Sequence, residues 1–200
     1  MRNALIVSFL LISLSGCTSL TQRDEALTHI SGVEFATDKG YEYIQAYRTS
    51  AQLTAKSADL EACVLQNVSN RDVVLTDSSS GFVDVYTGRY FDVSNSVTAS
   101  GGSVIKKAEK HRVIADGTTM YSANKSANDN RVVRFTLTID MDKTTIHYYF
   151  SNIQQALINS GGSPNKGFFD IRVNEGAKPS AVIAMLNHSA DKMTQCMNQP

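Results

Sequence analysis

Hydrophobic positions along the chain recur with two different periods, which separate helical from extended segments. Between residues 41 and 66, apolar side chains return every three or four positions, and this spacing predicts one long helix. Its apolar residues fall on two nearly opposite sides, which favours burial within one domain and leaves a dimer interface as the alternative. A second stripe with the same spacing follows Pro179, which fits the first turn of a C-terminal helix.

Alternating hydrophobic residues and β-forming side chains predict strands between the two helices. The clearest hairpin combines residues 132–141 and 144–150, with Asp142 and Lys143 in its turn. Further strands are expected at residues 71–77, 82–86, 89–93, 118–123 and 168–173. Residues 104–115 fit either the solvated face of a helix or a pair of edge strands.

Polar and glycine-containing stretches predict where these elements end. Residues 94–103 are rich in Ser, Asn and Gly and are expected to form a loop, and the Asp-Gly pair at 116–117 a turn. Residues 151–158 fit a short helix that a Gly-Gly pair at 161–162 would end. The order of elements predicts an α+β fold, with N-terminal and C-terminal helices packed on one face of a mainly antiparallel sheet.

The first seventeen residues show a third pattern. Arg2 precedes an uncharged apolar run at residues 4–14, whose length matches a signal peptide and falls short of a membrane span. The run ends in Leu14-Ser15-Gly16-Cys17, which resembles the lipobox of bacterial lipoproteins. This resemblance implies cleavage before Cys17, lipid on its sulfur, and anchoring by two or three acyl chains. Thr18, rather than Asp, follows the cysteine, which in the enteric pattern favours the outer membrane, on its periplasmic face.

These patterns divide the chain into three parts. Residues 1–16 are expected to be the signal peptide, residues 17–40 the lipidated N-terminus and a polar tether, and residues 41–200 a single α+β periplasmic domain. Within the tether, Leu27 and Ile30 alternatively form one short helix. No second long apolar run occurs, so the lipid is the expected anchor; an ordinary secreted protein with a chance cysteine at the cut is the alternative.

Two cysteines remain after the leader, and each lies near the end of a predicted helix. Cys63 and Cys196 form an even pair, which in an oxidising compartment predicts one disulfide between the two helices. Closing a loop of 196 − 63 = 133 positions stabilises a fold by up to roughly 5 kcal/mol in the chain-entropy model. Two free thiols, or a Cys196 that pairs with another molecule, are the alternatives.

Charge argues against nucleic acid as a partner. One of the 19 basic residues lies in the leader, so 18 basic residues face 19 acidic ones in the remainder. A balanced chain of this kind offers no electrostatic attraction to a phosphate backbone. Its abundant Ser, Thr and Asn suit a secreted β-rich domain.

Titratable and nucleophilic residues form no pattern that predicts a catalytic, metal or cofactor site. The histidines follow no metal-ligand spacing; they are His29, His111, His147 and His188. His147 shares a strand face with Thr145 and Tyr149, expected to be the solvent side of a hairpin and alternatively the wall of a polar pocket. Asp140 and Asp142 lack the glycine and glutamate of a calcium loop. No hydrolase or phosphate-binding motif occurs, so we expect no enzyme activity.

Aromatic residues offer the one candidate binding surface. Seven of them follow the predicted strands: Phe82, Tyr86, Tyr90, Phe91, Tyr121, Tyr148 and Tyr149. Antiparallel sheets also use such residues to fill their core, and we expect these to be core residues.

The hairpin of residues 132–150, with the Ser151-Asn152-Ile153 that follows it, resembles a group of small bacterial envelope domains. Those domains have a TATA-binding-protein-like fold and no known function. The resemblance implies a curved sheet backed by helices, and it implies no activity.

The function expected from these features is that of a non-enzymatic envelope lipoprotein. Such a protein is anchored to the membrane through Cys17 and binds another envelope protein or helps to organise a complex. An immunity or inhibitor protein, which meets a toxin or a foreign enzyme in the periplasm, is a specific version. The alternative is a carrier or sensor of a small apolar ligand or lipid, held between the sheet and its helices.

Overall fold

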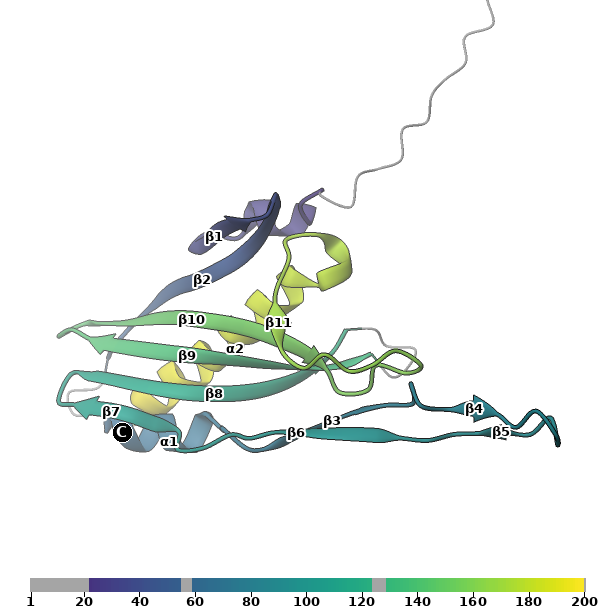
Figure 1. The fold of residues 1–200 in the computed structure, drawn as a ribbon. Helices are drawn as coiled ribbons and strands as arrows, with labels where there is room; N and C mark the ends of the chain where they lie inside the picture. The colour runs from purple at the N-terminus through teal and green to yellow at the C-terminus, as the bar shows by residue number, and fades with distance from the viewer. Residues whose placement is uncertain (1–21, 55–58, 124–128, 200) are drawn as a thin grey trace, which may run out of the picture.

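The computed structural model describes residues 22–54, 59–123 and 129–199 of the chain. Its elements form an α+β fold with a mainly antiparallel sheet, as the order of elements predicts (Figure 1). In chain order they are η1 (Glu25–His29), β1 (Val33–Asp38), β2 (Tyr41–Gln52), α1 (Leu60–Asn67), β3 (Val73–Asp77), β4 (Phe82–Val83), β5 (Tyr90–Phe91), β6 (Asn95–Ala99), β7 (Ile105–Glu109), β8 (Arg112–Ser122), β9 (Asn130–Met141), β10 (Thr145–Leu157), β11 (Phe169–Asp170), η2 (Glu175–Ala177) and α2 (Pro179–Met197).

A seven-stranded antiparallel sheet forms the body of the protein. Its strands follow the order β1-β2-β10-β9-β8-β7, and β11 adds to β10. Helix α2 lies across one face of this sheet (Figure 1). Two tyrosines hold it there: the Tyr47 hydroxyl lies 2.9 Å from Asn187 Oδ1, and the Tyr148 hydroxyl 2.8 Å from Thr194 Oγ1. Alternate residues of β9 and β10 point into this interface and form the core.

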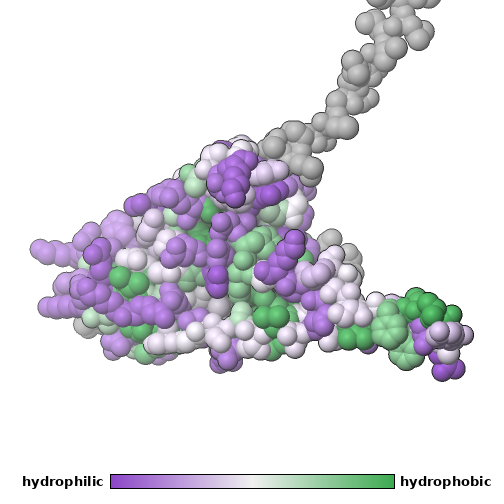
Figure 2. Space-filling model, viewed as in Figure 1, coloured by the Kyte–Doolittle hydropathy of each residue, from purple (hydrophilic) through white to green (hydrophobic). Residues whose placement is uncertain are grey.

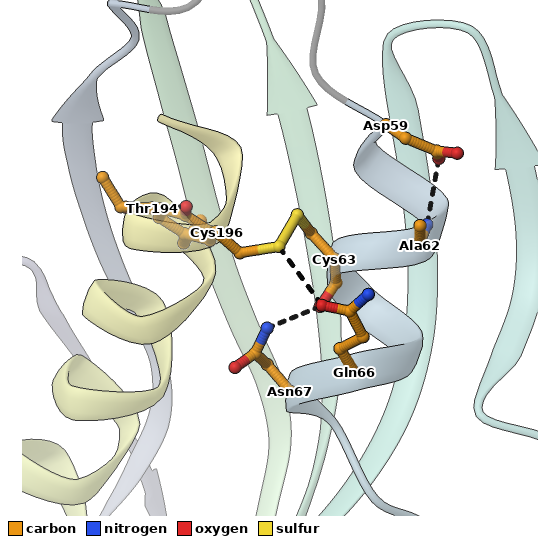
Figure 3. Close-up of a disulfide and its surroundings, with 8 residues drawn as sticks. Asp59, Ala62, Cys63, Gln66, Asn67, Thr194 and Cys196 are labelled. Carbon is orange, nitrogen blue, oxygen red and sulfur yellow. Dashed lines mark hydrogen bonds between the residues drawn. A yellow bond between two sulfur atoms is a disulfide. The ribbon is translucent and has the colours of Figure 1, made fainter. Parts of the chain in front are cut away.

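A disulfide between Cys63 and Cys196 joins α1 to α2, which confirms the predicted pairing (Figure 3). The two Cα atoms lie 5.8 Å apart. Asp59 caps α1, because its carboxylate accepts a hydrogen bond of 3.0 Å from the Ala62 backbone N–H. At the other end, Asn67 Nδ2 donates to the Cys63 carbonyl at 2.9 Å. The disulfide therefore holds the short, capped helix α1 against the long helix α2.

The prediction of one long helix over residues 41–66 is wrong for most of its length. Residues 41–52 form strand β2, and only Leu60–Asn67 at the end are helical. Tyr41, Tyr43 and Tyr47 are β-formers, and β2 pairs with β1 on one side and β10 on the other. The apolar residues that suggested one helix are instead divided between strand β2, as for Ile44 and Tyr47, and helix α1, as for Leu60 and Val64.

The predicted tether is also wrong over its described part. Residues 25–29 form the 3-10 helix η1, in agreement with the alternative of a short helix, and β1 pairs with β2. Leu27 is buried in the core. Asp24 accepts a hydrogen bond of 2.7 Å from the Ser180 hydroxyl on α2, and Arg23 forms an ion pair with Glu42. The folded domain therefore begins well before residue 41.

The predicted short helix at residues 151–158 is wrong, because β10 continues to Leu157. A β-bulge between Ser151 and Gln154 bends the strand, and Asn152 adopts a positive φ of 51° there. Gly117 likewise lies inside β8 rather than in a turn. A Cβ at this position would approach the Phe135 ring to 2.7 Å, so the close packing of the sheet requires glycine.

Three further predictions were settled by strand pairing. Residues 94–103 are not all loop, because β6 pairs with β3. Residues 104–115 form the edge strand β7 and the start of β8, its inner neighbour, rather than a helix. The strand expected at 168–173 is reduced to β11 and a single bridge between Tyr43 and Arg172.

Candidate functional site

An arm of residues 73–99 extends away from the body of the protein (Figure 1). Its stem is the ribbon of β3 and β6, and its far end is the small hairpin of β4 and β5. We call residues 82–93 at this end the tip. The arm comprises residues between α1 and β7, so it is an insertion that leaves and rejoins the body at one place.

The tip exposes a group of large apolar side chains on and beside a strand pair that no other described segment covers. They are Phe82, Val83, Val85, Tyr86, Tyr90, Phe91 and Val93. Val85 and Tyr86 at the turn are 87% and 95% exposed. Figure 2 shows the hydrophobic surface gathered at this end of the molecule. The rings of Phe82 and Phe91 stack across the hairpin with centroids 5.3 Å apart.

Hydrogen bonds hold the stem and the turn in a fixed shape. Asp77, at the end of the stem, accepts hydrogen bonds from Asn95 Nδ2 and from the backbone N–H groups of Ser79 and Asn165, each at 2.9 Å. Donors from Asn95 and Ser79 hold the pKa of Asp77 well below its usual range. At the turn, Asp84 accepts from backbone N–H groups nearby, which lowers the pKa of that carboxyl.

One edge of the arm is attached to the body and the other is open. The backbone of Thr76 donates to Ile158 at 2.8 Å and accepts from Ser160 at 3.0 Å. Leu75 is buried with Val132 of the sheet. Strand β6, on the other side, pairs only with β3 among the residues that the structure describes. Its outer edge therefore has unpaired backbone groups.

A second candidate is a cleft of about 420 Å³ between the base of the arm and the face of the sheet opposite the helices. Its polar lining includes Asn70, Arg71, Asp116, Thr136, Asn152 and Asp170. Arg134 donates to Gln154 Oε1 at 2.9 and 2.6 Å, and Gln154 Nε2 donates to Asp170 Oδ1 at 2.8 Å. The polar side chains of the cleft thus largely satisfy one another, which makes it a weaker candidate than the tip.

Asp140, His147 and Tyr149 line one hollow of about 340 Å³ on the face of the sheet opposite the helices. His29 and His188, by contrast, lie on η1 and α2. Asp140 forms an ion pair with Arg112 at 2.6 Å, and His147 Nε2 lies 3.3 Å from Asp142 Oδ2. Tyr149 packs beneath the guanidinium of Arg48. Across the three described ranges, no group of three or more His, Cys, Asp or Glu residues could hold a metal ion.

The expectation that the aromatic residues form the core is wrong for five of the seven, namely Tyr149 and the four aromatics of the tip. Tyr148 is buried and burial raises its pKa to about 12, but the four aromatics of the tip are exposed. The valines beside them, such as Val83 and Val85, were missed. A signal for them exists in the sequence, because apolar residues at 82–83 and 85–86 are adjacent and so cannot share one face of a strand.

Cys17 and its leader lie outside the described residues, so the structure does not address the lipidation site. Within the described part of the chain, neither helix combines the length and the hydrophobicity needed to cross a bilayer.

Comparisons with known proteins identify no family. No protein-family profile and no curated protein matches the chain. Among solved structures, a DUF4468 family protein from Bacteroides ovatus is similar over 90% of this chain and 98% of its own, with 9% sequence identity and a TM-score of 0.40. That similarity is too low to support an argument about fold or function.

Proposed function

We propose that this chain is a membrane-anchored envelope lipoprotein that binds another protein through the tip of its arm and catalyses no reaction. The observation that carries the proposal is the group of seven large apolar side chains exposed on the tip. Exposed apolar patches on a folded protein mark interaction sites, because water contact with such a surface is unfavourable. Burying one Phe or Val side chain fully stabilises a complex by about 1.5–3 kcal/mol.

The shape of the tip also suits binding. Asp77 and Asp84 fix the stem and the turn, so the aromatic side chains stand on a strand pair that is ordered before any partner arrives. A preorganised surface loses less conformational entropy on association than a flexible one. Tyr and Phe are also residues that concentrate binding energy at interfaces.

The anchor would place the domain close to a membrane surface. If Cys17 carries the lipid, only residues 18–22 separate it from Arg23, which forms the first backbone bridge to the domain at Asn174. Five residues span at most about 18 Å. The reach of the domain is therefore shorter than a tether ending at residue 40 would allow, and partners at the same membrane are favoured.

The alternative, a carrier of a small apolar ligand between the sheet and its helices, has less support. Residues of β9, β10 and α2 such as Leu137, Phe150 and Leu186 are fully buried against one another and fill this space. The cleft lies on the other face and has a polar lining.

A photo-crosslinking experiment in the native cell envelope tests the proposal. We expect a crosslinking amino acid in place of Tyr86 to give a discrete adduct with a different protein. The matched control is Met120 on β8, which is 67% exposed but belongs to the body, and the same substitution there should give none. Absence of any adduct at Tyr86, Val85 and Phe91, or adducts formed only with the same chain, would contradict the proposal.

The anchor needs its own test. Replacing Cys17→Ser should abolish metabolic labelling with a fatty acid and move the protein out of the membrane fraction. Retained labelling and unchanged fractionation would show that Cys17 does not carry the lipid.

A further inference from the structure

The open edge of β6 differs from the two edges of the main sheet. Strand β1 carries Glu34 and Asp38 and has a bulge beside Glu34. Strand β7 carries Lys106 and Lys107 and has a bulge there too. Charged side chains and bulges are the devices that stop an edge strand from pairing with another chain. Both outer edges of the body are therefore protected.

Strand β6 has neither device. Its register with β3 runs without a shift from Asn95 to Ala99. Residues 94–103 contain no charged residue and no proline. Val97, in the middle of β6, is 59% exposed. An uncharged, regular strand with one open edge is the kind of strand to which an extended segment adds by backbone hydrogen bonds.

We propose that β6 pairs in antiparallel fashion with β6 of a second copy of this chain, so that two arms join into one four-stranded sheet. The inference rests on the proposed function in one respect, since it treats the arm as an interaction element. It names a partner for the outer edge of β6, whereas the proposed function concerns the tip.

The composition of β6 points to a second copy, because the strand is compatible with itself. Pairing centred on Val97 places Val97 against Val97, and Ser96 against Thr98, across a two-fold axis. No like charges meet. The same operation on β7 would crowd the lysines of both copies together, which is unfavourable.

The pairing also gives the tip a position. With Val97 at the axis, residue n of one copy lies opposite residue 194 − n of the other, because 97 + 97 = 194. Val93 then lies opposite Gly101, and Phe91 opposite Ser103, of the second copy. Each tip is thus drawn alongside the base of the other arm, and the two-fold operation closes the assembly at two chains.

Cysteine crosslinking of the full-length chain tests this arrangement. Directly opposed residues of antiparallel strands have Cα atoms about 4.5–5.5 Å apart, which suits a disulfide. We expect mild oxidation to link two copies through Val97→Cys, which lies opposite itself. Because residue 96 lies opposite residue 98, a mixture of Ser96→Cys and Thr98→Cys chains should form mixed linked dimers, whereas either variant alone should link poorly. Val74→Cys is the matched control, because Val74 is 53% exposed on β3 of the same ribbon, and it should give no linked dimer. The unchanged chain shows any contribution from Cys17.

Sedimentation in detergent provides a second measurement. The wild-type chain should have twice the monomer mass, Val97→Lys should be monomeric because it places two ammonium groups together, and Val74→Lys should remain a dimer. A monomeric wild type, or no crosslink at any of the three β6 positions, overturns the inference. In that case a Tyr86 adduct with a different protein would still support the proposed function. Conversely, β6 crosslinks without such an adduct would support the pairing of two copies and contradict the proposed function.

Discussion

Removing the Cys63–Cys196 disulfide should lower the free energy of unfolding by about 2–5 kcal/mol. The bond closes a loop over 133 positions of sequence, for which chain entropy alone gives about 5 kcal/mol at 25 °C. The structure adds a local reason. Helix α1 has eight residues, fewer than the roughly 12–15 that an isolated helix needs in water, so it depends on its attachment to α2.

Urea unfolding of the full chain in detergent, followed by circular dichroism, measures this loss. A protein of this size has an m value of about 2 kcal/mol/M, so the midpoint should fall by about 1–2.5 M when Cys63→Ser and Cys196→Ser are combined. Reductant should lower the midpoint of the wild-type chain by a similar amount. It should leave the double variant unchanged, which shows that the effect does not arise elsewhere.

Equal midpoints for wild type and double variant, within about 0.3 M, would refute the reasoning. They would mean that packing of α1 on the body, rather than the covalent bond, holds the helix in place. Hydrogen exchange of α1 separates the two explanations, because α1 should lose protection first when the bond is absent and the sheet is still folded.

Three further predictions follow from local contacts. Gly117→Ala should cost about 1–3 kcal/mol in thermal or urea unfolding, because its Cβ would approach the Phe135 ring to 2.7 Å. The pKa of Tyr148 is raised to about 12, so its contribution to stability should be complete below about pH 10 and lost as the pH rises toward 12; Tyr148→Phe should flatten this dependence in unfolding curves. The pKa of Asp77 is lowered, so its contribution should be present above about pH 4 and lost at lower pH. At low pH, backbone amides of the arm such as that of Ser79 should lose protection from hydrogen exchange, after correction for intrinsic rates. The Asp77→Ala variant should show the same loss of protection at neutral pH.

Two elements of the C-terminal half, helix α2 and the β9–β10 hairpin, could be predicted from sequence because their signals are local. Pro179 and the apolar stripe after it define α2, and the turn at Asp142 defines the β9–β10 hairpin. Residues 41–52 could not be assigned correctly, because their apolar spacing fits a helix while the pairing of β2 with β10 joins residues about a hundred positions apart. The pattern within a segment contains no information about such a partner.

The candidate site was predicted only in outline. A hairpin around residues 87–88 is visible in the sequence, and so are its aromatic residues. Whether Tyr86 and Phe91 enter the core depends on the direction in which the stem leaves the body. That direction is fixed by contacts of Thr76 and Leu75 with the end of β10, a segment that the sequence suggested was helical.

The arm is built to be held out rather than folded back. Asp77 accepts hydrogen bonds from three residues at the end of the stem, and Asp84 orders the turn, so local hydrogen bonds maintain a shape that leaves much of the apolar surface of the tip exposed. A hairpin selected only for the stability of this chain would gain more by packing Phe82 and Phe91 against the sheet. The retained exposure is the strongest physical support for the proposal that these side chains are buried in a complex, and that the arm rather than the cleft is the binding site.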